Sequence, residues 1–138
     1  MSPADITQKM MDHDGFSQWL GVQVLDSGVG YSKIQLVVQK SMLNGFGVAH
    51  GGIAFSLADS CLAFASNSYG QHAVSIETSI NHLQPVFEGD TLTAESAETN
   101  RTRRTGLYLV KITNQKDELV ALFKGIVYVK DKAWADHT

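Results

Sequence analysis

The sequence has only one cysteine, Cys61, among its 138 residues, so no disulfide bond can form within one chain. A single thiol fits a reducing compartment, and we expect a cytoplasmic protein. No apolar run approaches the roughly 18–20 residues that a membrane-spanning helix needs. The first residues, Met1 to Ile6, lack a basic region followed by an apolar stretch. We therefore expect neither a secretory signal nor a membrane partner.

Positive charge is scarce as well. The 11 lysines and arginines are outnumbered by 14 acidic residues, which gives a formal net charge of −3. Such a chain lacks the diffuse positive field that non-specific nucleic-acid binding needs, so no nucleic-acid partner is expected. The spacing of His13, His72 and His137 does not match a set of metal ligands, so no metal is expected either.

Internal repeats, low-complexity tracts and linkers rich in proline, glycine or serine are also missing. Hydrophobic residues make up 43% of the chain and charged residues 18%, a composition that can form a core. Residues 1–138 are therefore expected to form a single domain. A short amphipathic helix is predicted at about residues 3–14, and the end of the chain, about residues 131–138, is expected to be loose.

A buried helix is the clearest element that the sequence predicts. Residues 53–68 contain no proline or glycine and are rich in alanine, and Asp59 is the only charged residue among them. This helix is therefore expected to be buried nearly all round. The pattern predicts a hairpin before it, between Leu20 and Val38, and four strands in a meander after Gly70. One apolar helix among so many strands predicts an α+β fold, with a curved antiparallel sheet wrapped around one long central helix.

Two glycines, Gly51 and Gly52, precede this helix. The first N–H groups of a helix have no partner within the helix and carry a partial positive charge. Because glycine has no side chain, a substrate carbonyl can approach those groups closely, as in an oxyanion site. The alternative is a glycine pair that only allows a tight turn into the helix, and spacing alone does not decide between the two.

Asp59 lies about two turns farther along the helix, at nearly the same helix angle as Gly52. A carboxylate on an apolar helix is costly unless it is paired or functional. We interpret Asp59 as a functional residue. The alternative is a structural aspartate that caps a neighbouring element or forms an ion pair.

Taken singly, the other polar residues favour structural roles. His50 and Asn44 lie in the loop before the helix, where such residues commonly bond the backbone. His82 alternates into an apolar strand face and is interpreted as a core or interface histidine. Cys61, on the helix face opposite Asp59, is interpreted as a packing residue.

Three arginines, Arg101, Arg103 and Arg104, form the one dense cluster of positive charge. An exposed, solvated turn is the default interpretation of such a cluster. The alternative is a site for phosphate groups, which guanidinium groups bind well.

The sequence around the buried helix resembles a known family. The segments LNG at 43–45, HGG at 50–52 and LAD at 57–59 resemble the phenylacetic-acid-pathway (PaaI-like) thioesterases of the hotdog superfamily. The resemblance extends from about Trp19 to Tyr128 and takes in QP at 84–85, GDTL at 89–92, TGLY at 105–108 and VALF at 120–123. An HGG motif with an aspartate eight residues after its first glycine and an asparagine six residues before its histidine is a specific combination.

This resemblance implies a chemical reaction and its residues. The expected reaction is hydrolysis of an acyl-CoA, of the aryl or phenylacetyl type, to a free acid and coenzyme A. The Gly51 N–H would polarise the thioester carbonyl, with Gly52 beside it at the substrate, and Asp59 would act as nucleophile or general base. Asn44 and His50 would hold the thioester end of the substrate. No cofactor is implied beyond the coenzyme A that is part of the substrate.

The resemblance also implies an assembly. Family members form homodimers with a continuous sheet and active sites shared between two chains, and commonly homotetramers. Some relatives position the attacking water with a serine at the place of Ser75, whereas the helix hydroxyl that others use is replaced here by Ala63. Arg103, together with Arg104 and Arg101, would lie near the phosphates of coenzyme A.

Two other functions stay open at this point. A hotdog dehydratase or hydratase would combine a histidine with a carboxylate, and His50 keeps that reaction open. A non-catalytic acyl-CoA-binding protein is the second alternative, but hotdog domains of that kind usually carry an added DNA-binding domain. The presence of both Gly51 and Asp59 favours the thioesterase.

Overall fold

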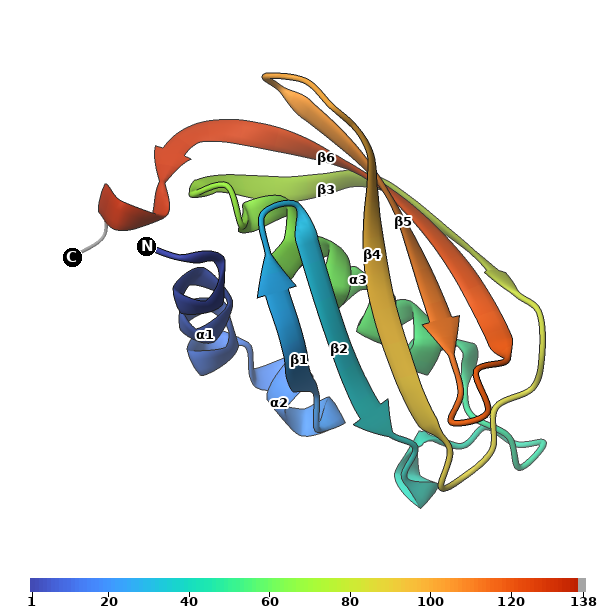
Figure 1. Cartoon of the computed structure of the whole chain (residues 1–138). Helices are drawn as coiled ribbons and strands as arrows, with labels where there is room; N and C mark the ends of the chain where they lie inside the picture. The colour runs from blue at the N-terminus through green and yellow to red at the C-terminus, as the bar shows by residue number, and fades with distance from the viewer. Residues whose placement is uncertain (137–138) are drawn as a thin grey trace.

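Six antiparallel strands form one curved sheet. The computed structural model describes residues 1–136 of the chain. The strands are β1 (Gln23–Gly28), β2 (Tyr31–Val37), β3 (Gln71–His82), β4 (Thr91–Arg101), β5 (Thr105–Thr113) and β6 (Leu119–Ala133). Their order across the sheet is β1-β2-β4-β5-β6-β3, and Figure 1 shows the sheet curving around the central helix.

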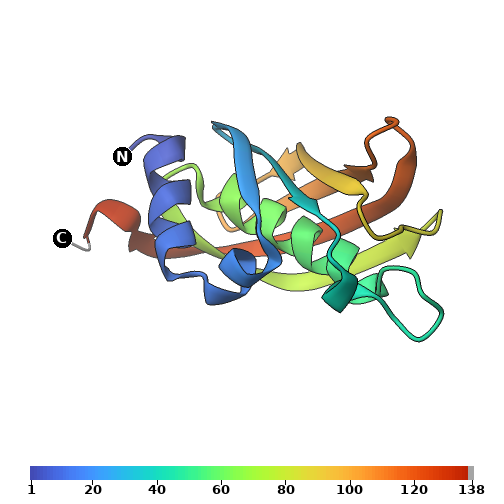
Figure 2. The ribbon, with the colours of Figure 1, turned by 90° about the horizontal axis from the view of Figure 1, so that it is seen from below.

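One long helix runs along the inner side of this sheet. The helices are α1 (Pro3–His13), α2 (Gly15–Leu20) and α3 (Gly51–Asn67), with short 3-10 helices η1 (Lys40–Met42) and η2 (Trp134–Asp136). α3 is the central helix, and α1 and α2 pack against it beside the sheet (Figure 2). The predicted α+β fold, with a curved antiparallel sheet around one long helix, is confirmed. The helix predicted at about residues 3–14 is present as α1.

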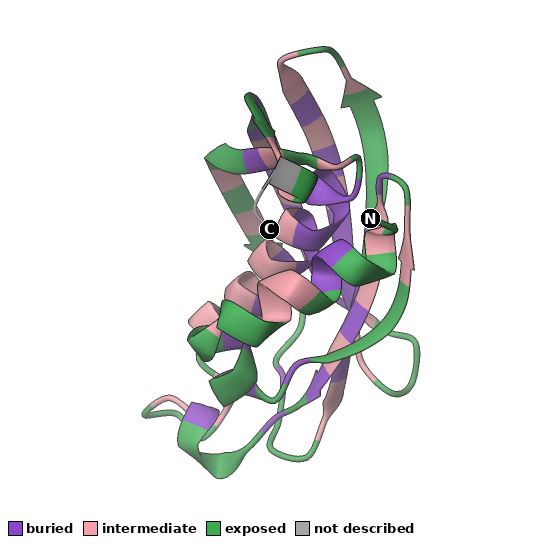
Figure 3. Ribbon diagram, turned by 90° about the vertical axis from the view of Figure 1, so that its left-hand side faces the viewer, coloured by how far each residue is buried: buried purple, intermediate pink, exposed green. Residues whose placement is uncertain are grey.

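The core lies between α3 and the inner face of the sheet, as the colouring by burial in Figure 3 shows. Apolar side chains of the helix are fully buried there, among them Leu57, Cys61, Leu62 and Phe64. They meet equally buried residues of the strands, among them Leu36, Leu92, Val110, Ile112 and Phe123. Burial of this apolar surface is the main favourable contribution to folding.

Leu62 of the helix packs directly against Gly125 of β6. A Cβ atom added there would lie 2.5 Å from Cδ2 of Leu62, closer than two carbon atoms approach in proteins. Glycine is therefore needed at this position by the short distance between helix and sheet, as glycines inside strands often are.

One side of α3 is less covered than the sequence predicts. Ser56, Asp59 and Ala63 share this side and are only half-buried. The expectation that the helix is buried nearly all round is therefore wrong. The reason is that the sheet of the same chain packs on the opposite side, where Leu57 and Cys61 are fully buried.

The place of β3 also differs from the predicted four-stranded meander. Only β4, β5 and β6 follow one another as neighbours, whereas β3 pairs with β6 at the edge of the sheet. A hairpin would need a short turn after β3, but residues 83–90 cross to the far side of the sheet. They are held there by hydrogen bonds from the Ala49 N–H to the Val86 carbonyl (2.7 Å) and from the Val38 N–H to the Asp90 carbonyl (2.9 Å).

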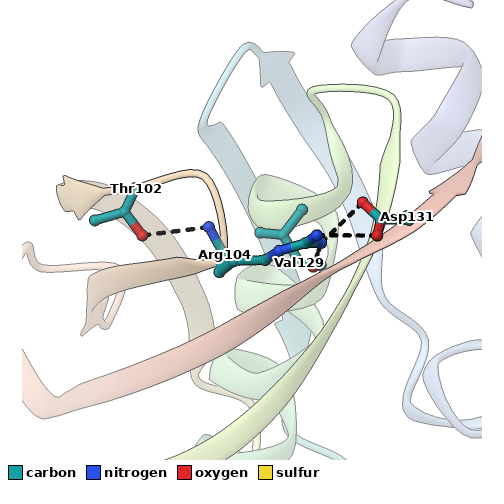
Figure 4. Close-up of polar contacts among 4 residues, drawn as sticks. All are labelled: Thr102, Arg104, Val129 and Asp131. Atoms are coloured by element: carbon teal, nitrogen blue, oxygen red, sulfur yellow. Dashed lines mark hydrogen bonds and ion pairs between the residues drawn. The ribbon is translucent and has the colours of Figure 1, made fainter.

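The end of the chain is more ordered than the predicted loose tail. β6 continues beyond Asp131, whose carboxylate accepts two hydrogen bonds from Arg104 at 2.8 and 2.9 Å (Figure 4). The indole N–H of Trp134 then donates to Asn67 Oδ1 at 3.0 Å. These contacts, together with the pairing of β6, fix the segment from Asp131 to Trp134 in place. Residues 137–138 lie outside the described residues.

Candidate active site

The start of α3 presents one free backbone N–H group. His50 is the N-cap residue, and its Nδ1 accepts a hydrogen bond from the Gly52 N–H at 2.9 Å. The His50 carbonyl accepts another from the Ile53 N–H at 2.9 Å. Among the described residues, none accepts a hydrogen bond from the Gly51 N–H. The partial positive charge of the helix end is therefore directed at whatever binds in front of Gly51.

The helix begins two residues earlier than predicted, because glycine is tolerated in the first turn when a side chain caps it. The cap also explains the second glycine. A Cβ atom at Gly52 would lie 3.1 Å from Nδ1 of His50, so a side chain would push the cap away. Gly52 thus has a structural role in this chain, and its N–H is already used.

The loop before the helix is organised by Asn44. Its Oδ1 accepts hydrogen bonds from the N–H groups of Phe46 (2.9 Å) and Val48 (3.4 Å), and its own N–H donates to the Val48 carbonyl (2.7 Å). The side-chain amide N–H₂ makes no hydrogen bond within the part of the chain that the structure describes. Asn44 therefore shapes the loop with its oxygen and keeps two donors for a ligand.

His82, at the end of β3, lies against Gly51. Its ring atoms Nε2 and Cε1 are 3.2 and 3.3 Å from the place where a Cβ of Gly51 would lie. Both residues line a cavity of about 360 Å³, together with His50 and mostly apolar residues that include Ala54 and Leu92. The sequence suggested a core or interface histidine, but His82 is exposed, so the core interpretation is wrong.

Asp59 lies on the uncovered side of α3 without a bonding partner. No hydrogen bond or ion pair to its carboxylate is present among residues 1–135. It lines a second cavity, of about 240 Å³, with Ala63, Val74 and Ser75. Partial burial raises the pKa of Asp59, and the negative charge of Asp14 raises it further. The structural alternative, in which Asp59 caps an element or pairs with a cation of its own chain, has no support.

The two cavities separate the predicted residues into two groups. Ser75 lines the cavity of Asp59, and His50 lines that of Gly51. Gly51 and Asp59 do not line a common cavity within one chain, because eight residues of helix separate them by about 12 Å along its axis. A single chain therefore brings the carboxylate and the free N–H to the same helix but not to the same point.

A polar contact that the sequence did not reveal reaches α3 next to Asp59. Asp14 caps α2 by accepting a hydrogen bond from the Ser17 N–H at 2.9 Å, and the Ser17 hydroxyl donates to its other oxygen at 2.6 Å. The same hydroxyl lies 2.8 Å from that of Ser60 on α3. The sequence contains one clue to this contact, since Asp14 is a typical N-cap residue. The helix that follows is too short to be recognised by periodicity.

The arginine cluster is divided among different contacts. Arg104 is held by the carboxylate of Asp131 (Figure 4), and Arg101 lies over the ring of Tyr69, with 3.6 Å between its guanidinium carbon and the ring centre. Arg103 is exposed and makes no hydrogen bond with the described residues. Of the arginines predicted near phosphates, Arg103 is therefore the exposed one that is not held by another side chain, whereas Nη1 of Arg101 is buried without a hydrogen-bond partner among the described residues.

The described residues contain neither a metal-binding cluster nor a membrane-spanning helix. No group of three or more histidine, cysteine, aspartate or glutamate side chains there is arranged to hold a metal ion. None of the described helices combines the length and the apolar character needed to cross a membrane.

The sequence is similar to that of known thioesterases and esterases. The family model for the thioesterase superfamily matches residues 46–121. The acyl-coenzyme A thioesterase PaaI of Escherichia coli K12 is 40% identical over 116 residues, which are 84% of this chain and 83% of that protein. A putative esterase of Archaeoglobus fulgidus is 43% identical over 119 residues, 86% of this chain and 77% of that protein.

Solved structures agree with these relatives. The E. coli PaaI protein from the phenylacetic acid degradation operon superposes with a TM-score of 0.93 at 35% identity, covering 95% of each chain. A hypothetical thioesterase from Streptococcus pneumoniae with coenzyme A superposes with a TM-score of 0.85 at 28% identity, covering 91% of this chain and 98% of that one.

The electrostatic effect of Asp14 on Asp59 leads to a first testable prediction. In Asp14→Asn the pKa of Asp59 should fall, because removing a nearby negative charge makes the ionised form of Asp59 less costly. Asparagine keeps the cap of α2 intact. The pKa is measured by NMR titration of the side-chain carboxyl carbon. Asp12→Asn, which removes an exposed charge from α1, is the control and should leave it unchanged; equal behaviour of the two variants would contradict the coupling.

Proposed function

This chain belongs to the thioesterase superfamily, and we propose that it hydrolyses acyl-CoA thioesters whose acyl group is of the aryl or phenylacetyl type. Thioester hydrolysis itself is the activity of its class, and the E. coli relative is an acyl-coenzyme A thioesterase. One observation supports the proposed mechanism: among the described residues, neither the half-buried carboxylate of Asp59 nor the N–H at the start of the same helix has a hydrogen-bond partner. The carboxylate costs free energy because it is partly buried, and the exposed N–H of Gly51 is open to a substrate.

The Gly51 N–H donates a hydrogen bond to the thioester carbonyl oxygen. As the carbonyl carbon is attacked, negative charge develops on that oxygen, and the positive end of α3 stabilises it. Gly51 is exposed and has no side chain, so the carbonyl can reach the N–H directly.

Asp59 supplies the base or the nucleophile, in its ionised form. As a general base it takes a proton from water, which adds to the carbonyl carbon; as a nucleophile it adds itself and forms an anhydride that water then cleaves. In both cases the C–S bond breaks, coenzyme A leaves with a proton, and the acid is released. Ser75 lies in the cavity of Asp59 and is placed to hold the water.

We propose that two chains complete each site. β3 is an edge strand with unpaired backbone groups, and its exposed side chains include Val74 (43%) and Ile76 (62%). If two copies of β3 pair antiparallel, the Ser75 end of one strand meets the His82 end of the other. That pairing brings Asp59 of one chain towards Gly51 of its partner, and it leaves room for two such dimers to form a homotetramer.

The substrate's two ends fit different features of the chain. The cavity beside Gly51 has walls formed largely by apolar residues, which suits an apolar acyl group. The phosphates of coenzyme A need cationic donors, and the free guanidinium of Arg103 is the proposed one. The S. pneumoniae relative was solved with coenzyme A, which supports the same ligand here.

Turnover of a panel of acyl-CoAs tests the substrate class. Phenylacetyl-CoA and other aryl thioesters should give the highest kcat/KM, measured as release of free thiol, and acetyl-CoA a lower one. Activity should survive a strong chelator, because no metal takes part in the proposed mechanism. A preference for straight-chain thioesters would contradict the aryl class, and hydration of an enoyl-CoA without thiol release would favour the dehydratase.

Replacing Asp59 tests the mechanism. Asp59→Asn keeps the size of the side chain but removes its charge, so kcat should fall by on the order of 10²–10⁴, the range for loss of a positioned acid–base group. Asp12→Asn is the matched control and should keep full activity. A folded, fully active Asp59→Asn protein would contradict the assignment.

The same variant should be at least as stable as the wild type at pH 7. The pKa of Asp59 is raised in the folded state, so its protonated form favours folding. This contribution to stability is fully present below the pKa that Asp59 has in the unfolded chain, and it is lost as the pH rises through the pKa in the folded chain. At pH 7 the wild type therefore carries the cost of a half-buried charge. The gain in thermal midpoint should shrink as pH falls below about 4. A lower midpoint with intact kcat would instead indicate a structural aspartate.

Mixing two inactive variants tests the shared site. In Gly51→Val the new Cβ lies against His82 and the side chain blocks the N–H, whereas Asp59→Asn lacks the carboxylate. A heterodimer of the two contains one site with both groups intact. Refolding the variants together should restore about a quarter of wild-type activity, because random pairing makes half of the dimers mixed. No recovery from a mixture shown to contain mixed dimers would place each site within one chain.

A further inference from the structure

We propose that His82 is a second hydrogen-bond donor to the thioester carbonyl oxygen, beside the Gly51 N–H. This assignment rests on the proposed function and adds a residue to it. It comes from the contact between the imidazole of His82 and the backbone of Gly51, two positions that lie 31 residues apart in the sequence.

The start of α3 offers fewer donors than an oxyanion site usually has. His50 already accepts from the N–H groups of Gly52 and Ile53, so only the Gly51 N–H is left. Oxyanion sites generally direct more than one donor at the developing charge. A second donor would therefore come from a side chain that reaches the front of Gly51. The Asn44 amide also keeps two donors, but Asn44 is not among the residues that line the cavity of Gly51, whereas His82 is.

His82 is in the right place. Its Nε2 is the ring atom closest to Gly51, at 3.2 Å from the place of a Cβ, and both residues line the same cavity. The ring is exposed and makes no hydrogen bond with residues 1–135, so its nitrogens are free for a ligand. The ring therefore lies near the Gly51 N–H and is not held by a hydrogen bond to another described residue.

The backbone that carries His82 is well fixed even though its side chain is exposed. His82 pairs with Ala121 in the ladder between β3 and β6, and the next N–H, that of Leu83, donates to the Val120 carbonyl at 2.9 Å. A donor on a strand held in this way loses little freedom when a substrate binds, which is what preorganised stabilisation of charge requires.

The proposed step transfers no proton to or from His82. An imidazole that carries a proton on Nε2 donates to the carbonyl oxygen, and the hydrogen bond strengthens as that oxygen becomes negative in the tetrahedral intermediate. When the C–S bond breaks and the carbonyl re-forms, the bond weakens again. His82 therefore stabilises the transition state more than the bound substrate.

His50 keeps a fixed and different position. Its Nδ1 is turned towards the Gly52 N–H, so its ring is part of the helix cap. The two histidines thus lie on different sides of the glycine pair, His50 against Gly52 and His82 against Gly51. Replacing His82 leaves the cap in place, and the test below separates the two residues for this reason.

Two variants of His82 test the donor. His82→Phe keeps an aromatic ring against Gly51 but cannot donate, and kcat for the best acyl-CoA should fall about 10–100-fold, less than for a fully buried oxyanion donor. KM should change little, since the bond forms mainly in the transition state. His82→Gln places an amide N–H near Nε2 and should recover most of the loss. His13→Phe, a change at an exposed histidine of α1, is the control and should keep full activity.

A spectroscopic measurement separates donation from packing. In the slow Asp59→Asn background, the infrared band of a ¹³C-labelled thioester carbonyl should lie below its position in water-free reference solvent when both donors are present. Adding His82→Phe should move the band back up, and adding His82→Gln should not. Thermal midpoints should stay close to that of the parent, because exposed substitutions change stability little.

The failure of this inference is distinct from failure of the proposed function. A wild-type protein that releases thiol from none of the acyl-CoAs would overturn the proposed function. A wild-type protein that is active, with His82→Phe equally active or with an unmoved carbonyl band, would overturn only the role of His82.

Discussion

The burial of α3 inside the sheet is the constraint on which the rest of the structure depends. The helix fits because Gly125 lets Leu62 approach β6 so closely that no Cβ could lie between them. The buried residues of the helix fill the core, and Asp59 lies on the side of the helix that is only half-buried. Its N-terminus must then end at the rim of the sheet, where Gly51 meets the last residue of β3. The site is a consequence of how the core is filled.

The polar groups of this helix are not satisfied evenly, and the difference is informative. The chain caps the N–H groups of Gly52 and Ile53 with a single residue, His50, yet leaves that of Gly51 free. Among the described residues the carboxylate of Asp59 likewise has no partner, and partial burial raises its pKa. A half-buried carboxylate without a partner reduces stability, and a departure of this kind on the helix that also carries the free N–H is expected where a ligand binds.

The sequence predicted what depends on local pattern and missed what depends on long-range register. The apolar helix, the strands and the lone aspartate follow from periodicity and composition, and the fold class followed from them. The edge position of β3 could not be predicted in this way, because it depends on the hydrogen bonds that residues 83–90 make with segments far away in the sequence. For the same reason the contact of His82 with Gly51 was missed, as were the pairing of Arg104 with Asp131 and the capping of α2 by Asp14. The first two contacts join residues that are far apart in the sequence, and the third caps a helix of only six residues. None of the three leaves a periodic signal in the sequence.

The edge strand β3 links assembly to chemistry. It carries Ser75 near its start and His82 at its end, so the same strand contributes to the surroundings of Asp59 and of Gly51. In an antiparallel dimer formed along β3, the spacing between these two residues would set how the two half-sites align. The pairing of β3 with β6 fixes which side chains of β3 face the core, so a shift of the pairing between two chains would move the His82 end of one strand away from the Ser75 end of the other. In the proposed dimer, the register of this one strand pair would therefore decide whether the sites are complete.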